Sequence, residues 1–380
     1  MKASIHLFRI AGIDIGIHFT WLFAFLLFAW TLADGFYPSY YESWSAGVYW
    51  GLGVLSSLLL FTSVLTHELA HSIVALRLGL RVKGITLFIF GGVSNMQGEA
   101  KRARDEFYVA VVGPATSLIL AGIFWLIYLF AFKEASPLAA LVFYLAFVNS
   151  LLGAFNLLPG FPLDGGRVLR SIIWAITGSV SKATNIASVV GQVFAFAFIG
   201  WGVFQIFAGD FLSGIWIIFI GWFLNTAADS SRKEVRLQED FKNVLAKDLM
   251  NMHPEVTNPN AVLTDIVDNY FLRKGRRALP VCDQDGRLIG IVTLSDLKKV
   301  SQDKWPTLTV ESIMTKDPLH TVGPNEDLSN VLKMLAEHDL NQIPVLEDGK
   351  LVGLLGRADM IRYLQARQEL GLGKKTKSGR

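Results

Sequence analysis

The 380-residue chain has a single cysteine, Cys282, and its first 228 residues carry only 22 charged side chains. One cysteine excludes an intrachain disulfide and suits a soluble part that lies in the reducing cytosol. Charge is scarce only in the N-terminal part, because the remaining 152 residues carry 45 charged side chains. The formal net charge of +3 is small and evenly divided, so nothing favours a nucleic-acid partner. The sequence therefore predicts a membrane protein followed by a soluble module.

Long apolar runs fill the part that lacks charge. Six are long enough to cross a bilayer as helices, at roughly 17–33, 48–76, 107–132, 138–158, 187–208 and 210–228. We do not expect the first to be a cleaved signal peptide, because no clear small-residue cleavage site follows it.

Basic residues predict the orientation of these spans. If the N-terminus is inside, the cytoplasmic segments hold Lys2, Arg9, Arg77, Arg81, Lys83, Lys101, Arg102, Arg104, Arg167, Arg170 and Lys182. The outer loops then hold one basic residue, Lys133. By the positive-inside rule, we expect a multi-pass protein of the cell membrane with both termini in the cytoplasm.

One charged motif, His67-Glu68-Leu69-Ala70-His71, interrupts the second apolar run. A charge inside a membrane helix costs a few kcal/mol, which argues against a chance match and for a function. Residues four apart share a helix face, so His67 and His71 can bind one metal, with Glu68 beside them as a general base. The ten residues from His67 to Arg77 span about 15 Å of helix. We therefore expect the metal short of the bilayer midplane, in a polar cavity open to the cytoplasm.

A catalytic zinc commonly has three protein ligands, and Asp164 is the best candidate for the third. It follows a segment in which Pro159 and Pro162 prevent a regular helix. Irregular backbone near membrane depth is tolerated where it lines a cavity. Taken alone, Asp164 is better interpreted as the N-cap of a helix from Gly165 to Ile176. Together with the two histidines, the ligand interpretation is favoured.

These motifs resemble those of the site-2 protease family of intramembrane zinc metalloproteases. That family pairs H-E-x-x-H, here His67–His71, with N-x-x-P-x-x-x-x-D-G on a later segment, here Asn156–Gly165. Gly113-Pro114-Ala115-Thr116-Ser117 is similar to its G-P-x-x-[NS] element. The resemblance covers residues 1–228. It implies one Zn²⁺ per chain bound by His67, His71 and Asp164, with Glu68 activating water and Asn156 positioning the substrate carbonyl or stabilising its oxyanion.

A transmembrane substrate must be unwound before cleavage, because a helix hides its peptide bonds. The segment Val82–Gln97 contains the β-forming run Gly84–Phe90, followed by Gly91-Gly92. An edge strand beside the metal could pair with an unwound substrate by strand addition. The alternative is a strand paired only within its own sheet. The early segment Ile5–Ile17 is expected to supply other strands of that sheet.

Residues 244–368 contain an internal repeat of about 64 residues. The matched pairs are Asp248-Leu249-Met250 with Ser312-Ile313-Met314, Leu279-Pro280-Val281 with Ile343-Pro344-Val345, Gly290-Ile291-Val292 with Gly353-Leu354-Leu355, and Asp296 with Asp359. Each unit reads as strand, helix, strand, strand, helix, with a turn at Asp285-Gly286 or Asp348-Gly349. The repeat resembles a tandem pair of CBS domains.

That second resemblance implies a regulatory module that binds an adenine nucleotide, ATP, ADP or AMP. It also implies a homodimer through the CBS domains as a candidate assembly. Thr293 and Asp296 are similar to the family's phosphate and ribose contacts. The second copy keeps Asp359 but has Gly356 in place of the hydroxyl, with Arg357 as a phosphate partner. Each Asp is equally a good helix cap, so both interpretations stay open.

The sequence thus predicts about six transmembrane helices with a small membrane-associated β-sheet, followed by an α/β tandem CBS module. The expected domains are a metalloprotease at 1–228, a linker at 229–243, CBS domains at 244–303 and 308–368, and a disordered basic tail at 371–380. The expected function is regulated intramembrane proteolysis of single-pass membrane proteins. A CBS-gated channel or transporter is the alternative. The protease is favoured because intramembrane charge concentrates at His67, Glu68, His71 and Asp164.

Overall fold

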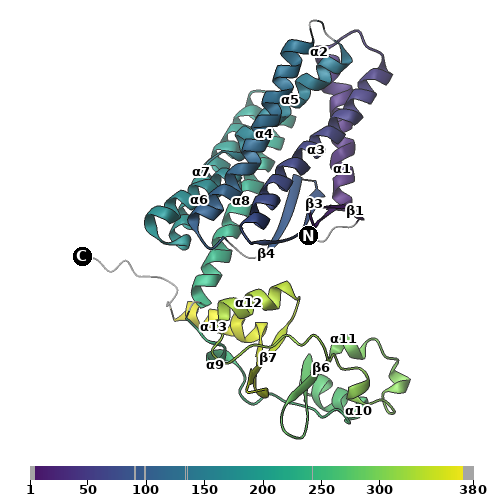
Figure 1. The fold of residues 1–380 in the computed structure, drawn as a ribbon, viewed down its shortest axis with the longest axis vertical. Helices are drawn as coiled ribbons and strands as arrows, with labels where there is room; N and C mark the ends of the chain where they lie inside the picture. The colour runs from purple at the N-terminus through teal and green to yellow at the C-terminus, as the bar shows by residue number, and fades with distance from the viewer. Residues whose placement is uncertain are drawn as a thin grey trace, which may run out of the picture. The chain divides into compact units, whose positions relative to one another are not determined.

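The computed structural model describes residues 5–89, 91–97, 100–132, 134, 136–241 and 243–370. Phe90, Lys133 and the predicted tail at 371–380 lie outside the described residues. The chain divides into two compact units, Met1–Val235 and Arg236–Arg380. Figure 1 shows the first as a bundle of long helices and the second as short helices and strands.

Six helical stretches of the first unit are long and apolar enough to cross a membrane, as the sequence predicts. They are Phe19–Tyr40 (α1 Phe19–Trp30, η1 Thr31–Phe36 and α2 Tyr37–Tyr40), α3 Ala46–Arg77, α4 Ala103–Ala131, α5 Pro137–Asn156, α7 Val180–Phe207 and α8 Phe211–Phe241. Large apolar side chains such as Phe130 and Phe207 point outward, more than four-fifths exposed. Such surfaces suit a hydrocarbon environment rather than water. Helix α8 continues through most of the segment 229–243 that the sequence assigns to a linker.

Helix α4 packs against α3, α5 and α6 (Asp164–Thr177). The buried polar residues of α3 include Ser63, His67 and His71, which lie four residues apart on one helix face. This face of α3 contacts α4 and α5, so both histidines point into the bundle rather than toward lipid.

A small sheet lies against α3, and both predicted segments contribute to it. Its strands are β1 Ile5–Ile10, β2 Ile13–Ile17, β3 Arg81–Phe88 and β4 Gly91–Gln97, in that order across the sheet. Strands β2 and β3 run parallel, and the other two pairs are antiparallel. Ile13, Ile15 and Ile85 are fully buried and pack with Leu65 and Leu69 of α3. This packing brings the sheet next to His67-Glu68.

Helix α6 begins at Asp164 and follows a loop with little room for side chains. A Cβ atom on Gly160 would lie 2.5 Å from the Cα of Gly191 in α7. The amide of Phe161 donates to the carbonyl of Ala187 at 3.2 Å, which fixes the loop to the same helix. The N-cap of α6 is Leu163, so Asp164 is the first helical residue rather than the cap. Its carboxylate is free to face α3.

The second unit contains the two predicted repeats. The first comprises α9 Ala246–Leu249, α10 Leu263–Ile266, η2 Val267–Leu272, β5 Ala278–Cys282, β6 Leu288–Thr293, α11 Leu294–Leu297 and η3 Gln302–Lys304. The second comprises η4 Val310–Ser312, α12 Leu328–Glu337, β7 Gln342–Glu347, β8 Lys350–Gly356 and α13 Arg357–Glu369. The expected first strand of each repeat is reduced to a single parallel bridge, Thr257 to Val281 and Val322 to Val345.

Each repeat opens with a segment that packs on the other repeat. A Cβ atom on Gly353 would lie 2.4 Å from the sulfur of Met250, and one on Gly290 would lie 2.6 Å from the sulfur of Met314. The backbone bridges Asn251 to Leu354 and Ile291 to Thr315 accompany these contacts. The methionines and glycines that recur in the sequence are therefore partners across the two repeats.

Candidate active site

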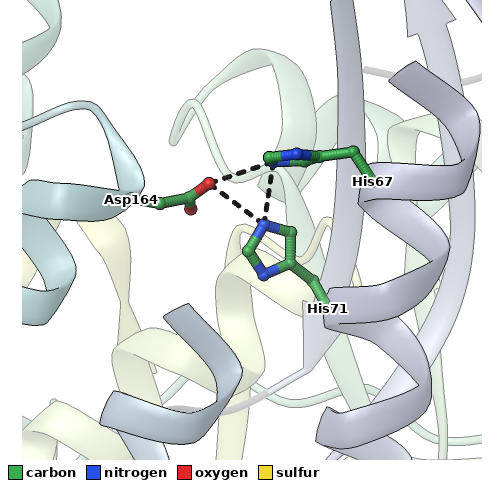
Figure 2. Close-up of side chains that lie close together, drawn as sticks. All are labelled: His67, His71 and Asp164. Carbon is green, nitrogen blue, oxygen red and sulfur yellow. Dashed lines mark hydrogen bonds and ion pairs between the residues drawn. The ribbon is translucent and has the colours of Figure 1, made fainter. Parts of the chain in front are cut away.

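The three predicted metal ligands meet inside the bundle. The Nε2 atoms of His67 and His71 are 3.1 Å apart, and Oδ2 of Asp164 lies 3.1 Å from the first and 3.0 Å from the second. Figure 2 shows the two imidazoles of α3 and the carboxylate of α6 pointing toward one another. Among the described residues, this is the group of histidine, cysteine and acidic side chains whose geometry could hold a metal ion.

Helix α4 orients both imidazoles through their other ring nitrogens. Nδ1 of His71 lies 2.5 Å from the carbonyl oxygen of Val109, and Nδ1 of His67 lies 2.9 Å from Oγ of Ser117. A carbonyl only accepts, so Nδ1 of His71 carries the proton, and the Nε2 of a neutral ring presents its lone pair to the cluster. The Ser117 hydroxyl can accept from His67 in the same way. Metal-binding histidines are commonly oriented by such contacts.

This donor set fits zinc. Ligand atoms at 2.0–2.2 Å from a tetrahedral ion lie about 3.3–3.6 Å apart, a little more than the observed separations of 3.0–3.1 Å. Two imidazole lone pairs and a carboxylate oxygen would repel one another in a buried site. A cation at their centre removes that repulsion, and two nitrogens with one oxygen are ligands that zinc prefers.

Glycine at position 113 provides the room for this cluster. A Cβ atom there would lie 2.1 Å from Nε2 of His71 and 2.7 Å from Nε2 of His67. Neither imidazole can move away easily, because each is held by α4 through its Nδ1 atom. The close approach of α4 to the cluster therefore requires glycine.

Glu68 lies beside the cluster and beneath the sheet. A Cβ atom on Gly92, in β4, would lie 2.5 Å from Cγ of Glu68, so the strand passes directly over this side chain. Gly91 has a φ of +126°, which favours glycine for a second reason. Ser72 and Ser94 also join α3 to β4 through a 2.9 Å hydrogen bond. The predicted segment Val82–Gln97 thus forms a hairpin whose second strand, β4, is at the edge of the sheet beside Glu68.

Asn156 is the predicted site residue whose side chain bonds within its own helix. It ends α5, and its side-chain amide donates to the carbonyl of Leu152 at 3.0 Å. This bond occupies one amide hydrogen and leaves the other hydrogen and the side-chain oxygen available to a ligand.

A buried ion pair fixes α6 to α4. Glu106 is 1% exposed, and its Oε1 accepts hydrogen bonds from Nε of Arg170 at 2.6 Å and from Nη2 of the same residue. Nε of Arg167 lies 3.9 Å from that oxygen. The sequence interpretation missed this role of Glu106. The signal that could have revealed it is the spacing of Glu106, Val109, Gly113 and Ser117, which places all four on one face of a helix.

Three of the four residues predicted for nucleotide binding, Thr293, Arg357 and Asp359, line two cavities of the second unit, each of about 490 Å3, and Asp296 lines neither of the two. The first, called the arginine-lined cavity, is lined by Arg276, Arg277, Arg357, Asp359 and Arg362 together with residues of both repeats. The second is lined by Thr293, Ser295 and Lys298 among others. Asp296 is nearly buried, and its Oδ2 accepts from the amide of Thr293 at 3.1 Å and from its hydroxyl at 2.6 Å. Thr293 is the N-cap of α11, and Asp296 completes a capping box with it, which is the helix-capping alternative for this residue.

The arginine-lined cavity carries excess positive charge. Asp359 accepts from the amide of Gly356 at 2.8 Å and pairs with Arg362. Glu255 pairs with Lys274 and Arg276, and those hydrogen bonds, chiefly that from Lys274, hold the pKa of its carboxyl below the usual range. Both carboxylates, Asp359 and Glu255, are thus neutralised by ion pairs with neighbouring cationic side chains. Arg277 and Arg357 have no carboxylate partner within the described part of the chain, so the cavity suits an anionic ligand.

Comparisons with known proteins agree with this arrangement. A model of peptidase family M50 matches residues 55–134 and 131–198, and a CBS domain model matches residues 246–303 and 310–366. The Rip3 protein of Mycobacterium tuberculosis, named as a zinc metalloprotease, is 36% identical over 370 residues, which cover 96% of this chain and 93% of that protein. Zinc metalloprotease MJ0392 of Methanocaldococcus jannaschii is 30% identical over 374 residues, 97% of this chain and 99% of that protein.

Among solved structures, a site-2 protease from Methanocaldococcus jannaschii is 30% identical and matches 60% of this chain and 94% of its own, with a TM-score of 0.42. The fold and the matches define a multi-pass membrane metalloprotease that depends on zinc. The chain belongs to the site-2 protease family, peptidase family M50, and carries a C-terminal pair of CBS domains.

Proposed function

We propose that this protease cleaves single-pass membrane proteins within or beside their transmembrane segments, at a zinc ion held by His67, His71 and Asp164. The observation that supports it best is the approach of two Nε2 atoms and one carboxylate oxygen to within 3.1 Å of one another on spanning helix α3 and the adjoining α6. Those three atoms come from the two motifs that identify the family.

The chemistry divides among a few residues. Zinc bound at this site would polarise the scissile carbonyl and make water easier to deprotonate. The Glu68 carboxylate takes a proton from the attacking water as the C–O bond forms, and it returns a proton to the amine as the C–N bond breaks. The second amide hydrogen of Asn156 is the candidate donor to the carbonyl oxygen, where negative charge develops.

The substrate class follows from where the site lies and what lies beside it. A helical substrate has no free backbone groups, whereas an unwound one has a full set. Strand β4 ends the sheet and crosses Glu68, so a substrate strand added to β4 would run past the catalytic base. Its peptide hydrogen bonds would then be satisfied by β4 while the scissile bond is exposed to the metal.

The test separates metal binding from chemistry in the full-length chain. Purified protein should contain about one zinc per chain. His67→Ala, His71→Ala and Asp164→Ala should each lose zinc, whereas His6→Ala, on the exposed strand β1, should keep it. Glu68→Gln should retain zinc and stop the cleavage of a reconstituted single-pass substrate, because the amide cannot accept the proton. Wild-type cleavage by Glu68→Gln would refute the assignment, and full zinc content in Asp164→Ala would remove that residue from the ligand set.

The proposal includes the cell membrane as the location, with both termini in the cytoplasm. It is supported by the asymmetry of basic residues, since Arg77 ends α3 and Arg81 and Lys83 follow it. Cysteine labelling from outside intact cells should then miss a cysteine introduced at Lys83 and modify one introduced at Glu42, in a chain in which Cys282 is replaced by serine. The reverse pattern would invert the topology.

The CBS pair is proposed as a regulator that binds an adenine nucleotide in the arginine-lined cavity. Its volume of about 490 Å3 is in the range of small-ligand sites. Arg277 and Arg357 are placed to bind phosphate, and Asp359 is the candidate ribose contact. Thr293 and Asp296 bond to each other, which makes the second cavity the weaker candidate.

The same unit is the proposed site of homodimerisation. Two large apolar side chains, Leu272 and Ile361, are more than half exposed on its surface. Light scattering on the full chain in detergent should report two copies, and Leu272→Glu with Ile361→Glu should reduce it to one. A monomeric wild-type protein would contradict the proposal.

A further inference from the structure

One face of helix α4 contacts the two histidines of the proposed metal site and also contacts α6, the helix that carries the third proposed ligand. Val109 orients His71, Ser117 orients His67, and Gly113 allows both rings to approach. Glu106 is on the same face, one turn before Val109, and reaches α6 instead of α3. The distance from each proposed ligand to α4 is thus controlled by a different residue of this face.

The third ligand is the one with the least local support. Asp164 starts α6, and the loop before it contains two prolines and no regular secondary structure. Its position relative to α3 depends on how α6 lies against α4. Arg167 and Arg170, about one and two turns after Asp164, both approach Glu106, and they are the charged groups that tie these two helices together.

We propose that Glu106 is a positioning residue of the metal site, which holds α6 through Arg170 and Arg167 where Asp164 reaches His67 and His71. This inference rests on the proposed role of Asp164 as a zinc ligand. Glu106 does not touch the metal. Its carboxylate is buried, so removing its charge leaves two arginines that must find other partners, and α6 is then free to shift.

The test uses the full-length chain in detergent and measures zinc affinity by competition with a chromophoric chelator. Glu106→Gln keeps the shape of the side chain and removes its charge. We expect zinc affinity to fall about 10–100-fold, as is usual when an outer partner of a metal ligand is lost. Asp105→Asn, which changes the neighbouring acidic residue of α4, should leave the affinity unchanged. In the cobalt-substituted protein, Glu106→Gln should change the visible absorption in the same direction as Asp164→Ala.

A double-mutant cycle distinguishes positioning from a general loss of packing. If Glu106 acts through Asp164, then Glu106→Gln should cause no further loss of zinc affinity in a chain that already has Asp164→Ala. Exchanging the charges, Glu106→Arg with Arg170→Glu, should restore part of the affinity. If Glu106→Gln does not fold, Arg170→Lys keeps the charge without the forked donor and should give a smaller loss in the same assays.

Each outcome decides between the two proposals. Wild-type zinc affinity and cobalt spectrum in folded Glu106→Gln, with loss in Asp164→Ala, would overturn the role of Glu106 and leave the ligand set intact. An equal loss from Glu106→Gln in both backgrounds would show a structural tie only. Full zinc affinity in Asp164→Ala would overturn the ligand set, and the role of Glu106 with it.

Discussion

Single atoms decide the geometry of the proposed metal site. The cluster of His67, His71 and Asp164 is surrounded by groups that leave almost no freedom: a carbonyl at Val109, a hydroxyl at Ser117 and the missing side chain at Gly113. Each of them comes from α4, and none of them binds the metal. Adding one methyl group to this face of α4 should therefore lower the affinity for zinc.

Gly113→Ala tests that statement. The new methyl would overlap Nε2 of His71, with 2.1 Å between the atoms, and the ring is held at its other nitrogen. We expect zinc affinity to fall at least ~10-fold and stability to fall by about 1–3 kcal/mol. Zinc titration and thermal unfolding of the full chain measure the two effects.

The matched control is Gly122→Ala on the same helix, where a Cβ atom would meet nothing within 4 Å. It should bind zinc like the wild type. Equal zinc affinity in Gly113→Ala and Gly122→Ala would show that the site relaxes around a methyl group and that the close approach of α4 does not control metal binding.

The sequence pattern predicted the proposed metal ligands more readily than the residues that hold those ligands in place. His67 and His71 are four residues apart within a single helix, and such a local spacing can be recognised from the sequence alone. Asp164 needed the second motif, because nothing local separates a ligand from a helix cap. The supporting roles of Val109, Ser117 and Glu106 depend on how α4 lies against α3 and α6. Helix packing is a tertiary property, and residue spacing on one helix does not name the partner of its face.

At the scale of elements, the sheet brings a free strand edge to Glu68, the proposed catalytic base. The β-forming run Gly84–Phe90 suggested the strand, and the structure assigns the edge to β4 instead, because β3 is paired on both sides. Pairing order cannot be read from β propensity, since an internal and an edge strand can have the same composition. Of the two glycines after the run, Gly92 is explained by its close contact with Glu68 of α3 and Gly91 by its φ of +126°.

Photocrosslinking tests strand addition at β4. A photoreactive residue in place of Val93, which is exposed on this strand, should crosslink to a single-pass substrate trapped on the Glu68→Gln protein. The same probe in place of Leu7, on the opposite edge strand β1, should not, because β1 is separated from Glu68 by the width of the sheet. Mass spectrometry of the products identifies the site. Crosslinks from Leu7 and none from Val93 would move the substrate to the other edge.

At the scale of the whole molecule, the repeat was predicted correctly from the sequence because the same motifs occur twice in the same order. Met250 and Gly353, and likewise Met314 and Gly290, recur together since each methionine packs on the glycine of the other repeat. What the sequence left open was the choice between ligand and cap for Asp296 and Asp359. The outcome depends on local hydrogen bonds, and Asp296 proves to bond mainly to Thr293.

Nucleotide binding and its effect on cleavage can be measured on the intact chain. Isothermal titration with ATP, ADP and AMP should detect binding that Arg277→Ala and Arg357→Ala each weaken about 10-fold, a loss that fits charge-assisted hydrogen bonds to phosphate. Lys316→Ala, which removes a surface cation outside both cavities, should bind like the wild type.

Saturating nucleotide should also change the rate of substrate cleavage, since a regulator must bind two states of the protease with different affinity. Binding with no change in rate would leave the CBS pair a structural or dimerising element. Absence of binding would remove the nucleotide from the proposal.

The separation of the ligands along the chain has a consequence for how the enzyme is made. Asp164 is 97 residues from His67 and 93 from His71. On the proposed ligand set, α3 therefore enters the membrane with two of the three ligands, and the third is added only after α4, α5 and the loop before α6 have been synthesised. A ribosome-bound chain that ends before Asp164 has no complete site to capture zinc. Zinc binding is then a late step of biogenesis. A partly synthesised chain cannot cleave newly inserted membrane proteins nearby, because it has no complete metal site.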